Sequence, residues 1–368
     1  MVNVVLAGGG TAGHTSPLIA TAEQLSIADP GGSLICVGTA KGLETRVIPE
    51  AGLTLELIPP VPLPRQLNVN LLKVPARLIG AVRAASQILR RARADVVIGF
   101  GGYVSMPVYL AARHAHIPVV VHEQNALPGL ANRVAARFAA AVLTTFPGTG
   151  LPHAQRVGLP VRAAIAELAQ QGRAGRRAAA RAAFGLRVDQ PVLLVSGGSS
   201  GARSINESLL AARDELLAQG VQIVHVLGLK NFHDDQTVTD SATGAGYHPL
   251  AYVDDMASAY AAADLMLARS GAGTVVETAV VGLPAIMVPL PIGNGEQARN
   301  AEPLVAADAA VLIADDELSG EGLVQQVVPL IKDPDRLARM GESAQRVMPA
   351  GAAERVADVV LQEAHDDR

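Results

Sequence analysis

The sequence predicts an α/β protein made of two doubly wound parallel sheets, and three observations support this. Short apolar runs alternate with helix-length segments, which gives parallel strands joined by right-handed crossovers. The alternation pauses once, in the Gly- and Pro-rich stretch Pro147–Val161, which we interpret as a linker. The 368 residues also exceed what one hydrophobic core usually supports. We therefore predict domains at residues 1–160 and 161–368, with the terminal helical region packing back on the first domain.

The individual elements follow from length, periodicity and bounding Gly or Pro residues. Before the linker, strands are expected at Asn3–Leu6, Ser33–Val37, Thr54–Ile58, Asp95–Gly99, Pro118–His122 and Ala141–Thr145, and helices at Ser16–Ala28, Leu71–Arg93, Met106–His114 and Pro128–Ala136. After it, strands are expected at Pro191–Ser196, Val221–Leu227, Pro249–Val253, Asp264–Ala268, Pro284–Val288 and Ala310–Ile313, and helices at Arg203–Ala218, Asp255–Ala262, Thr274–Val280 and Glu296–Ala306. A final helical region runs from Asp335 to the end, with a break near Pro349–Gly351.

Composition narrows the class of protein. Hydrophobic residues make up 49% and charged residues 17%, which suits parallel sheets covered by helices on both faces. The net charge of −4 argues against non-specific nucleic-acid binding. No apolar stretch reaches the roughly 18 residues that span a bilayer, and the N-terminus lacks a signal-peptide pattern. The single cysteine, Cys36, lies in an expected strand and is interpreted as a buried apolar residue, so we expect a cytoplasmic protein.

Three glycine-rich turns each end an expected strand and open a helix, at Ala7–His14, Gly99–Pro107 and Ser196–Asn206. Glycine lets a backbone approach an anion closely, and a helix N-terminus offers free N–H groups. Three such turns at equivalent places favour a phosphate-rich ligand. The first turn lacks the dinucleotide G-x-G-x-x-G spacing, and no acidic residue closes the second strand, which argues against an NAD-dependent oxidoreductase.

Polar residues gather after the expected strands. His14 ends the first turn and is either a general base or a helix-capping residue. Four hydrogen-bonding side chains in succession, His122–Asn125, follow a buried strand without a packing reason, and Glu123 among them is a rival base. Glu277 either holds ribose hydroxyls or caps its helix, and the preceding turn, Arg269–Thr274, suits a pyrophosphate.

With these residues assembled, the chain resembles the MurG family of UDP-GlcNAc:undecaprenyl-diphospho-muramoylpentapeptide N-acetylglucosaminyltransferases. The blocks that carry the resemblance span nearly the whole chain: GGTAGH (Gly9–His14), GFGGYVS (Gly99–Ser105), HEQNALPGLANR (His122–Arg133), GGSSGAR (Gly197–Arg203), DDMASAYAAAD (Asp254–Asp264) and RSGAGTVVE (Arg269–Glu277). The resemblance implies a GT-B fold, with two Rossmann-like domains whose parallel sheets face each other across a cleft.

The resemblance also implies the reaction. The C4 hydroxyl of the muramoyl sugar of lipid I attacks the anomeric carbon of UDP-GlcNAc with inversion, giving lipid II and UDP for peptidoglycan synthesis, cell shape and division. The rival candidates for the base are His14 and Glu123. Helix dipoles disfavour a charged imidazole at a helix N-terminus, so His14 is preferred. No cofactor is required, and a divalent metal would only stimulate. The partners implied are UDP-GlcNAc, lipid I and the cytoplasmic face of the cell membrane, where the protein would be peripheral.

Matched position by position, the family implies donor contacts on both sides of the linker. These fall on Thr11, Ala12, Gly13, Asn125, Arg162, Ser199, Val253, Ala272, Gly273, Thr274, Val275, Val276, Glu277 and Gln297. Among them, Glu277 would hold the ribose, Val253 the uracil and Gln297 the sugar hydroxyls. The sequence departs from the family's pattern at Leu159, Ser200, Gly273 and Glu296.

Membrane contact would come from one apolar patch with basic neighbours. Its residues are Leu71, Leu72, Val74, Leu78 and Ile79, flanked by Lys73 and Arg77. The alternative is an ordinary amphipathic helix that faces the core. Two other functions remain open at this point: a UDP-sugar 2-epimerase, and a sugar-nucleotide-binding protein without turnover.

Overall fold

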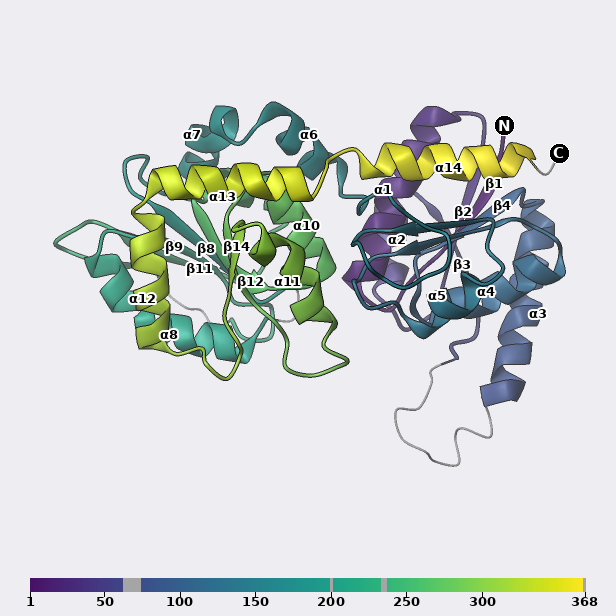
Figure 1. Ribbon diagram of the computed structural model, residues 1–368, viewed down its shortest axis with the longest axis horizontal. Helices are drawn as coiled ribbons and strands as arrows, with labels where there is room; N and C mark the ends of the chain where they lie inside the picture. The colour runs from purple at the N-terminus through teal and green to yellow at the C-terminus, as the bar shows by residue number, and fades with distance from the viewer. Residues whose placement is uncertain (62–73, 199–200, 233–236, 367–368) are drawn as a thin grey trace. The chain divides into compact units, whose positions relative to one another are not determined.

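The computed structural model describes residues 1–61, 74–198, 201–232 and 237–366, which form two compact units (Figure 1). Unit 1 comprises Met1–Arg162 and Gly351–Arg368, and unit 2 comprises Ala163–Ala350. The chain therefore crosses between units two residues after the predicted boundary and returns to unit 1 for its last helix.

Unit 1 is built on one parallel sheet of seven strands in the order β3-β2-β1-β4-β5-β6-β7. The strands are β1 (Asn3–Ala7), β2 (Ser33–Gly38), β3 (Thr54–Leu57), β4 (Val96–Gly99), β5 (Val119–Glu123), β6 (Ala141–Thr144) and β7 (Ala154–Arg156). Most of these strands are short apolar runs, because both faces of the sheet are covered and neither face selects polar residues.

The helices of unit 1 cover both faces of this sheet. They are α1 (Ala12–Ala28), α2 (Glu44–Glu50), α3 (Val74–Ala92), α4 (Gly102–His114), α5 (Leu130–Ala135) and α14 (Ala352–Asp366). Val4 and Leu6 of β1 point into the core that α1 and α14 close, whereas Val5 and Ala7 point into the core that α3, α4 and α5 close. The alternation along one strand shows directly that the sheet is buried on both sides.

Unit 2 repeats this architecture with the strand order β10-β11-β9-β8-β12-β13-β14. The strands are β8 (Val192–Ser196), β9 (Gln222–Val226), β10 (Val238–Thr239), β11 (Gly246–Leu250), β12 (Leu265–Arg269), β13 (Ala285–Val288) and β14 (Ala310–Leu312). All pairings are parallel except that of β10 with β11 at one edge.

Helices α8 (Arg203–Ala218) and α12 (Gly320–Ile331) close a core of unit 2 against one face of the sheet, which includes Leu193, Leu265 and Ile286. The remaining helices are α6 (Ala163–Gln171), α7 (Ala174–Ala183), α9 (Met256–Ala262), α10 (Ala272–Val280), α11 (Glu296–Ala306) and α13 (Pro334–Val347).

The structure corrects several predicted elements. The predicted linker Pro147–Val161 contains β7, whose exposed side chains carry no apolar signal because strand pairing uses only the backbone. The strand predicted at Pro249–Val253 lies earlier, at Gly246–Leu250. Helices α2, α6, α7 and α12 were not predicted. The first is only seven residues long and α7 is mostly Ala and Arg, whereas α12 has an apolar stripe at Leu323, Val327 and Leu330 that the prediction missed. Cys36 is fully buried, as predicted.

In each unit the strand order reverses beside the first strand, between β1 and β4 and between β8 and β12. Ligands of doubly wound sheets bind at the carboxyl ends of the strands where the order reverses. The first two glycine-rich turns follow β1 and β4, while the third turn and the turn Arg269–Thr274 follow β8 and β12. The sheet topology therefore gathers the sequence blocks in pairs, one pair in each unit.

Candidate active site

His14 lies in the first turn of α1 and is held by one ring nitrogen. Its Nδ1 is 2.8 Å from the carbonyl oxygen of Phe100 and 2.9 Å from Oε1 of Gln124. Both partners are acceptors, so Nδ1 carries the proton and donates it. A neutral ring then has its lone pair on Nε2, which has no hydrogen-bond partner among the described residues. This is the tautomer that a general base requires.

Gly102 gives the His14 ring its space. Gly102 has φ +75°, a conformation that disfavours other residues, and a Cβ there would lie 3.6 Å from Nε2 of His14 and 3.1 Å from the carbonyl oxygen of Gly9. The second glycine-rich turn thus passes directly beside the ring and the first turn. A Cβ at this position would be in ordinary contact with the His14 ring and tight against the Gly9 carbonyl.

Glu123 ends β5 and is 2% exposed. Its Oε1 accepts from the amide of Asn125 at 2.9 Å, and its Oε2 accepts from the amide of Gly129 at 3.0 Å and from Nδ2 of Asn132 at 2.9 Å. Burial raises the pKa of Glu123, while these hydrogen bonds act in the opposite direction. Both oxygens are therefore engaged in fixing the loop that carries Asn125.

His122 faces the interior rather than a ligand. It is completely buried, and its Nε2 lies 2.9 Å from the carbonyl oxygen of Gly158. Burial lowers the pKa of His122 from 6.5 to about 4, partly offset by that hydrogen bond, so the ring is neutral at physiological pH. Of the polar run after β5, Asn125 is the half-buried member at the surface of the loop.

The other residues of unit 1 that were predicted to bind the donor lie at the start of α1 and at the end of the unit's first segment. Thr11 is the N-cap of α1, and Ala12 and Gly13 form the first turn of that helix, where amide groups lack carbonyl partners in a preceding turn. Arg162 is the last residue of the unit's first segment and is half-buried.

The turn after β12 delivers an N-terminus of α10 that suits an anion. Gly271 is the N-cap and has no side chain with which to cap the amides of Ala272, Gly273 and Thr274. These amides and the helix dipole favour a diphosphate. The side chains of Val275 and Val276 are buried in the core, and the Val275 amide already donates to Gly271.

Glu277 and Gln297 are both held by neighbours. Tyr260, itself 2% exposed, donates its hydroxyl to Oε2 of Glu277 at 2.8 Å. Oε1 of Gln297 accepts from the amide of Leu290 at 3.0 Å and so shapes the loop before α11. Val253 is 8% exposed, and Ser199 lies outside the described residues.

Two residues at these edges were not predicted. Glu44 binds the first glycine-rich turn, and Tyr260 orients Glu277. A weak signal for Glu44 was present, because it follows Gly42 soon after the carboxyl end of a strand. Tyr260 gives no such signal, since only the packing of α9 against the sheet places it next to α10.

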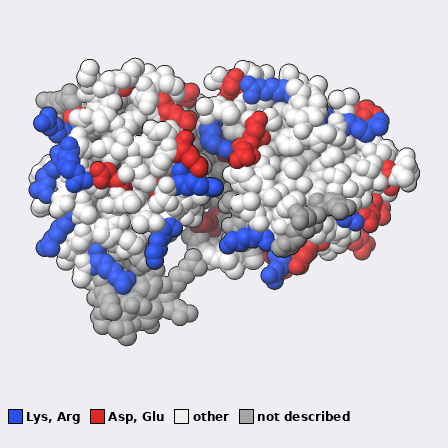
Figure 2. All heavy atoms as spheres, turned by 180° about the vertical axis from the view of Figure 1, so that it is seen from behind, with Lys and Arg blue, Asp and Glu red and all other residues white. Residues whose placement is uncertain are grey.

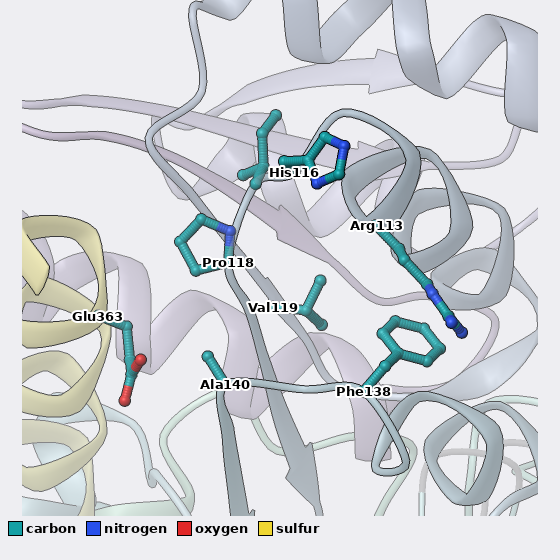
Figure 3. A pocket seen from close by; sticks show the side chains of 8 residues that line it. Arg113, His116, Pro118, Val119, Phe138, Ala140 and Glu363 are labelled. Carbon is teal, nitrogen blue, oxygen red and sulfur yellow. The ribbon is translucent and has the colours of Figure 1, made fainter. Parts of the chain in front are cut away.

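One cavity in unit 1 lies away from these residues. It measures about 380 Å³ and is found at the amino ends of β5 and β6, where Arg113 stacks over Phe138 (Figure 3). The strands' carboxyl ends, with the glycine-rich turns, are at the opposite edge of the same sheet. Among the described residues, no group of three or more His, Cys, Asp and Glu side chains is arranged to hold a metal ion.

Comparison with known proteins identifies the family. Residues 4–144 match the glycosyltransferase family 28 N-terminal domain, and residues 192–358 match its C-terminal domain. The chain belongs to glycosyltransferase family 28. This confirms the resemblance drawn from the sequence blocks and the GT-B fold that it implied.

Individual relatives of this family 28 chain are similar over nearly their whole length. A Cutibacterium acnes protein named UDP-N-acetylglucosamine–N-acetylmuramyl-(pentapeptide) pyrophosphoryl-undecaprenol N-acetylglucosamine transferase is 62% identical, covering 98% of this chain and 97% of the relative. A Nocardioides protein of the same name is 54% identical and covers 98% of each chain.

Solved structures agree with this assignment. The crystal structure of Acinetobacter baumannii MurG superposes with a TM-score of 0.76 at 29% identity, covering 98% of this chain and 100% of that one. A Neisseria meningitidis UDP-GlcNAc 2-epimerase has a TM-score of 0.67 at 13% identity and coverage of 98% and 100%, a likeness that shows the shared fold alone.

Proposed function

We propose that this chain transfers N-acetylglucosamine from UDP-GlcNAc to the C4 hydroxyl of the muramoyl sugar of lipid I, giving lipid II and UDP. The observation that carries this is the 62% identity, over 98% of the chain, to a relative named for that transfer. The 2-epimerase alternative has only a fold-level likeness in its support, and a binding protein without turnover would not need the free Nε2 of His14.

The chemistry assigned to unit 1 is proton removal. As the C4 oxygen of the acceptor attacks the anomeric carbon, its proton passes to Nε2 of His14. The bond from that carbon to the UDP oxygen breaks at the opposite face, so the configuration inverts and UDP leaves with the electron pair. The Phe100 carbonyl and Gln124 Oε1 hold Nδ1–H and stabilise the imidazolium that forms.

Glu123 suits a different role. Its carboxylate accepts two hydrogen bonds from the loop that carries Asn125 and a third from Asn132 on α5, and a proton on Glu123 would weaken these bonds. We therefore assign Glu123 to holding Asn125, the predicted contact to the sugar, and His14 to the base.

Donor binding is assigned to unit 2. The N-terminus of α10, at Ala272–Thr274, would take the diphosphate, and Glu277 would accept hydrogen bonds from the ribose hydroxyls. This helix terminus supplies positive potential where negative charge develops on UDP. We propose that a divalent metal is therefore not required, and the expected result is transfer that continues in EDTA, slowed at most by the loss of metal stimulation.

One segment of unit 1, which includes α3, suits attachment to a membrane surface. None of the helices among the described residues is long and apolar enough to cross a bilayer. The segment from Leu57 to Ala94 contains seven Lys and Arg residues and no Asp or Glu. On α3 in this segment Ile79 is 53% exposed, next to exposed Arg77 and Arg83, while Ala81, Ala85 and Ile88 on the same helix are buried. Leu71, Leu72 and Lys73 lie outside the described residues.

Basic side chains also predominate over acidic ones on the face of unit 1 that Figure 2 shows. An exposed aliphatic residue among arginines suits the headgroup region of an anionic bilayer. We propose that α3 attaches the protein to the cytoplasmic face of the cell membrane as a peripheral protein.

The reaction is tested by measuring UDP release from UDP-GlcNAc with and without a soluble lipid I analogue. The proposal predicts release that depends on the acceptor and a β-1,4-linked disaccharide product. Release of UDP without acceptor would favour an epimerase-type reaction, and binding without any release would favour a non-catalytic protein.

Attachment is tested by vesicle co-sedimentation of the double variant Leu78→Ser/Ile79→Ser. It should bind vesicles containing phosphatidylglycerol more weakly than wild type and retain UDP binding. The matched control is Leu210→Ser/Val305→Ser, which removes two exposed side chains, 41% and 38% accessible, from unit 2. Equal loss of binding in both variants would contradict a role for α3.

A further inference from the structure

Glu44 is a buried carboxylate that binds backbone groups outside its own helix. It is the first residue of α2 and is 0% exposed. Acidic residues in the first turn of a helix ordinarily lie near water and interact with their own helix. Glu44 instead reaches a turn 34 residues earlier in the chain, and it forms no ion pair with a Lys, Arg or His among the described residues.

Its oxygens accept from the first glycine-rich turn and from the end of β2. Oε2 accepts from the amide of Gly10 at 2.9 Å. Oε1 accepts from the amide and from the hydroxyl of Thr39, each at 3.0 Å. Burial raises the pKa of Glu44, but hydrogen bonds from the amides of Gly10, of Glu44 itself and of Thr39, and from the Thr39 hydroxyl, outweigh it and hold the pKa below its ordinary value. The group that binds the turn is therefore the carboxylate.

Three glycines leave room for this carboxylate. A Cβ at Gly9 would lie 2.6 Å from Oε1 of Glu44, one at Gly38 would lie 2.6 Å from its Cγ, and one at Gly42 would overlap Oε2. Real Cβ atoms do not approach so closely, so each position admits only glycine while Glu44 is in place. The first glycine-rich turn is shaped around Glu44, in addition to any ligand.

The same network reaches the second glycine-rich turn and the surroundings of His14. The hydroxyl of Thr39 lies 3.3 Å from that of Tyr103, which is in the first turn of α4. Gly102, next to Tyr103, borders Nε2 of His14 and the carbonyl of Gly9. Glu44 thus connects, through Thr39 and Gly10, the two turns between which the His14 ring lies.

We propose that Glu44 is a positioning residue for the transfer reaction: by binding Gly10 and Thr39 it fixes the two glycine-rich turns so that Nε2 of His14 meets the acceptor hydroxyl. This rests on the proposed function, in which His14 is the base. Glu44 does not touch substrate, and its effect passes through the backbone of the first turn. A misplacement of about 1 Å in such a turn is enough to cost about 100-fold in rate.

The test is Glu44→Gln, which keeps the shape but turns an amide NH₂ toward N–H or O–H donors. At saturating substrates kcat should fall by between about ten- and 100-fold. The dissociation constant for UDP, which lacks the transferred sugar, should stay within twofold, because the diphosphate and ribose contacts are assigned to α10 of unit 2. The acidic limb of the pH–rate profile should remain, since His14 is still present. The matched control is Glu50→Gln on the same helix, whose side chain is 64% exposed and which should behave as wild type.

A second pair of variants serves if Glu44→Gln does not fold. Thr39→Val removes the hydroxyl that links Glu44 to Tyr103 and should lower kcat by about two- to tenfold, the value of one hydrogen bond. Thr39→Ser keeps that hydroxyl and should restore the rate.

The inference is overturned if folded Glu44→Gln turns over within twofold of wild type, or if it only lowers the melting temperature without changing kcat. Equal rates for Thr39→Val and Thr39→Ser would also overturn it. The proposed function fails separately, if wild-type protein shows no acceptor-dependent transfer.

Discussion

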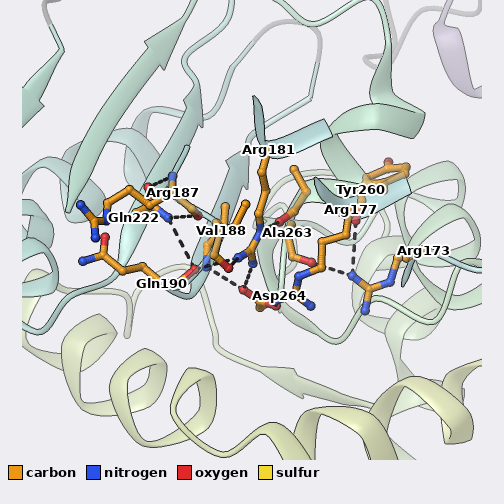
Figure 4. Close-up of polar contacts among 12 residues, drawn as sticks. Arg173, Arg177, Arg181, Arg187, Val188, Gln190, Gln222, Tyr260, Ala263 and Asp264 are labelled. Atoms are coloured by element: carbon orange, nitrogen blue, oxygen red, sulfur yellow. Dashed lines mark hydrogen bonds and ion pairs between the residues drawn. The ribbon is translucent and has the colours of Figure 1, made fainter. Parts of the chain in front are cut away.

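Each unit contains a polar cluster beside its sheet, and the two clusters differ in how fully their hydrogen-bonding groups are paired. In unit 2 the arginine cluster, formed by Arg173, Arg177, Arg181 and Asp264, lies at the amino ends of β8 and β12 (Figure 4). In unit 1 the His14 cluster, formed by His14, Phe100 and Gln124, lies at the carboxyl ends of β1, β4 and β5.

The arginine cluster is closed on itself. Arg181, 1% exposed, binds Asp264 at 2.6 Å and donates to the carbonyls of Ala262, Val188 and Gln190. Arg177 also pairs with Asp264. Three guanidinium groups thus share one carboxylate, and Arg173 and Arg181 also donate to backbone carbonyls, so the buried groups of this cluster are engaged within the protein.

The His14 cluster is open by comparison. Its one donor, Nδ1–H, is matched by two neutral acceptors, while Nε2 has no partner among the described residues. Burial and hydrogen bonding alone therefore do not mark a functional site. The informative feature is an incompletely satisfied group at the carboxyl edge of the sheet, where ligands of this fold bind.

The largest effect is expected at Arg181, in the arginine cluster. Arg181→Met should destabilise the protein by about 3–5 kcal/mol, because it leaves Asp264 buried with less compensation. Thermal unfolding measures this effect. Turnover per folded molecule should not change. The control is Arg187→Met, which disrupts an ion pair with Asp189 whose side chains are 54% and 62% exposed and should leave thermal unfolding close to that of wild type. A large loss of kcat in folded Arg181→Met would show that the cluster is not purely structural.

His122 is a buried residue of unit 1 whose ionisation should affect the stability of the fold rather than catalysis. Its pKa in the folded protein, about 4, is below the unfolded value of 6.5, so below pH 6.5 the unfolded chain binds a proton that the folded chain does not. The free energy of unfolding should therefore fall by about 3 kcal/mol as the pH drops from 6.5 to 4.

Urea denaturation across this pH range measures the effect. His122→Gln should show a shallower pH dependence than wild type, whereas His153→Gln, at an exposed position, should keep the wild-type slope. Parallel slopes in wild type and His122→Gln would contradict the assignment.

Glu277 extends the comparison to the carboxyl edge of unit 2. If Glu277 holds the ribose, Glu277→Gln should weaken UDP-GlcNAc binding by about 1.5–3 kcal/mol, or about ten- to 150-fold, while unfolding is little changed. Isothermal titration calorimetry gives the affinity. The control is Glu321→Gln, at an exposed position of α12. An unchanged donor affinity would remove Glu277 from the site.

The smallest expected effect belongs to Tyr260. Tyr260→Phe removes the hydroxyl that donates to Glu277 at 2.8 Å and should weaken UDP-GlcNAc binding by about two- to tenfold. In the Glu277→Gln background the same change should have almost no further effect. Additive losses in the double variant would show that Tyr260 acts independently of Glu277.

The sequence predicted the two sheets and the turns because parallel strands are apolar runs and glycine turns are distinctive. It also selected His14, whose place at the end of a turn is a local feature. What it missed depends on contacts between distant segments: Glu44 meets Gly10 only after β2 and α2 fold beside β1, and Tyr260 meets Glu277 only through packing of α9. Glu123 was selected as a rival base, but its partners, two in the following loop and one on α5, are visible only in three dimensions.

In the proposed reaction, Nε2 of His14 takes the proton from the C4 hydroxyl of the acceptor sugar. The most direct test is the pH–rate profile of wild type, His14→Ala and Glu123→Gln with UDP-GlcNAc and a soluble lipid I analogue. The account predicts that His14→Ala lowers kcat by about 10²- to 10⁴-fold, leaves UDP affinity unchanged and removes the acidic limb, which Glu123→Gln retains. If His14→Ala keeps that limb and Glu123→Gln loses it, the base is Glu123 and His14 only positions the acceptor.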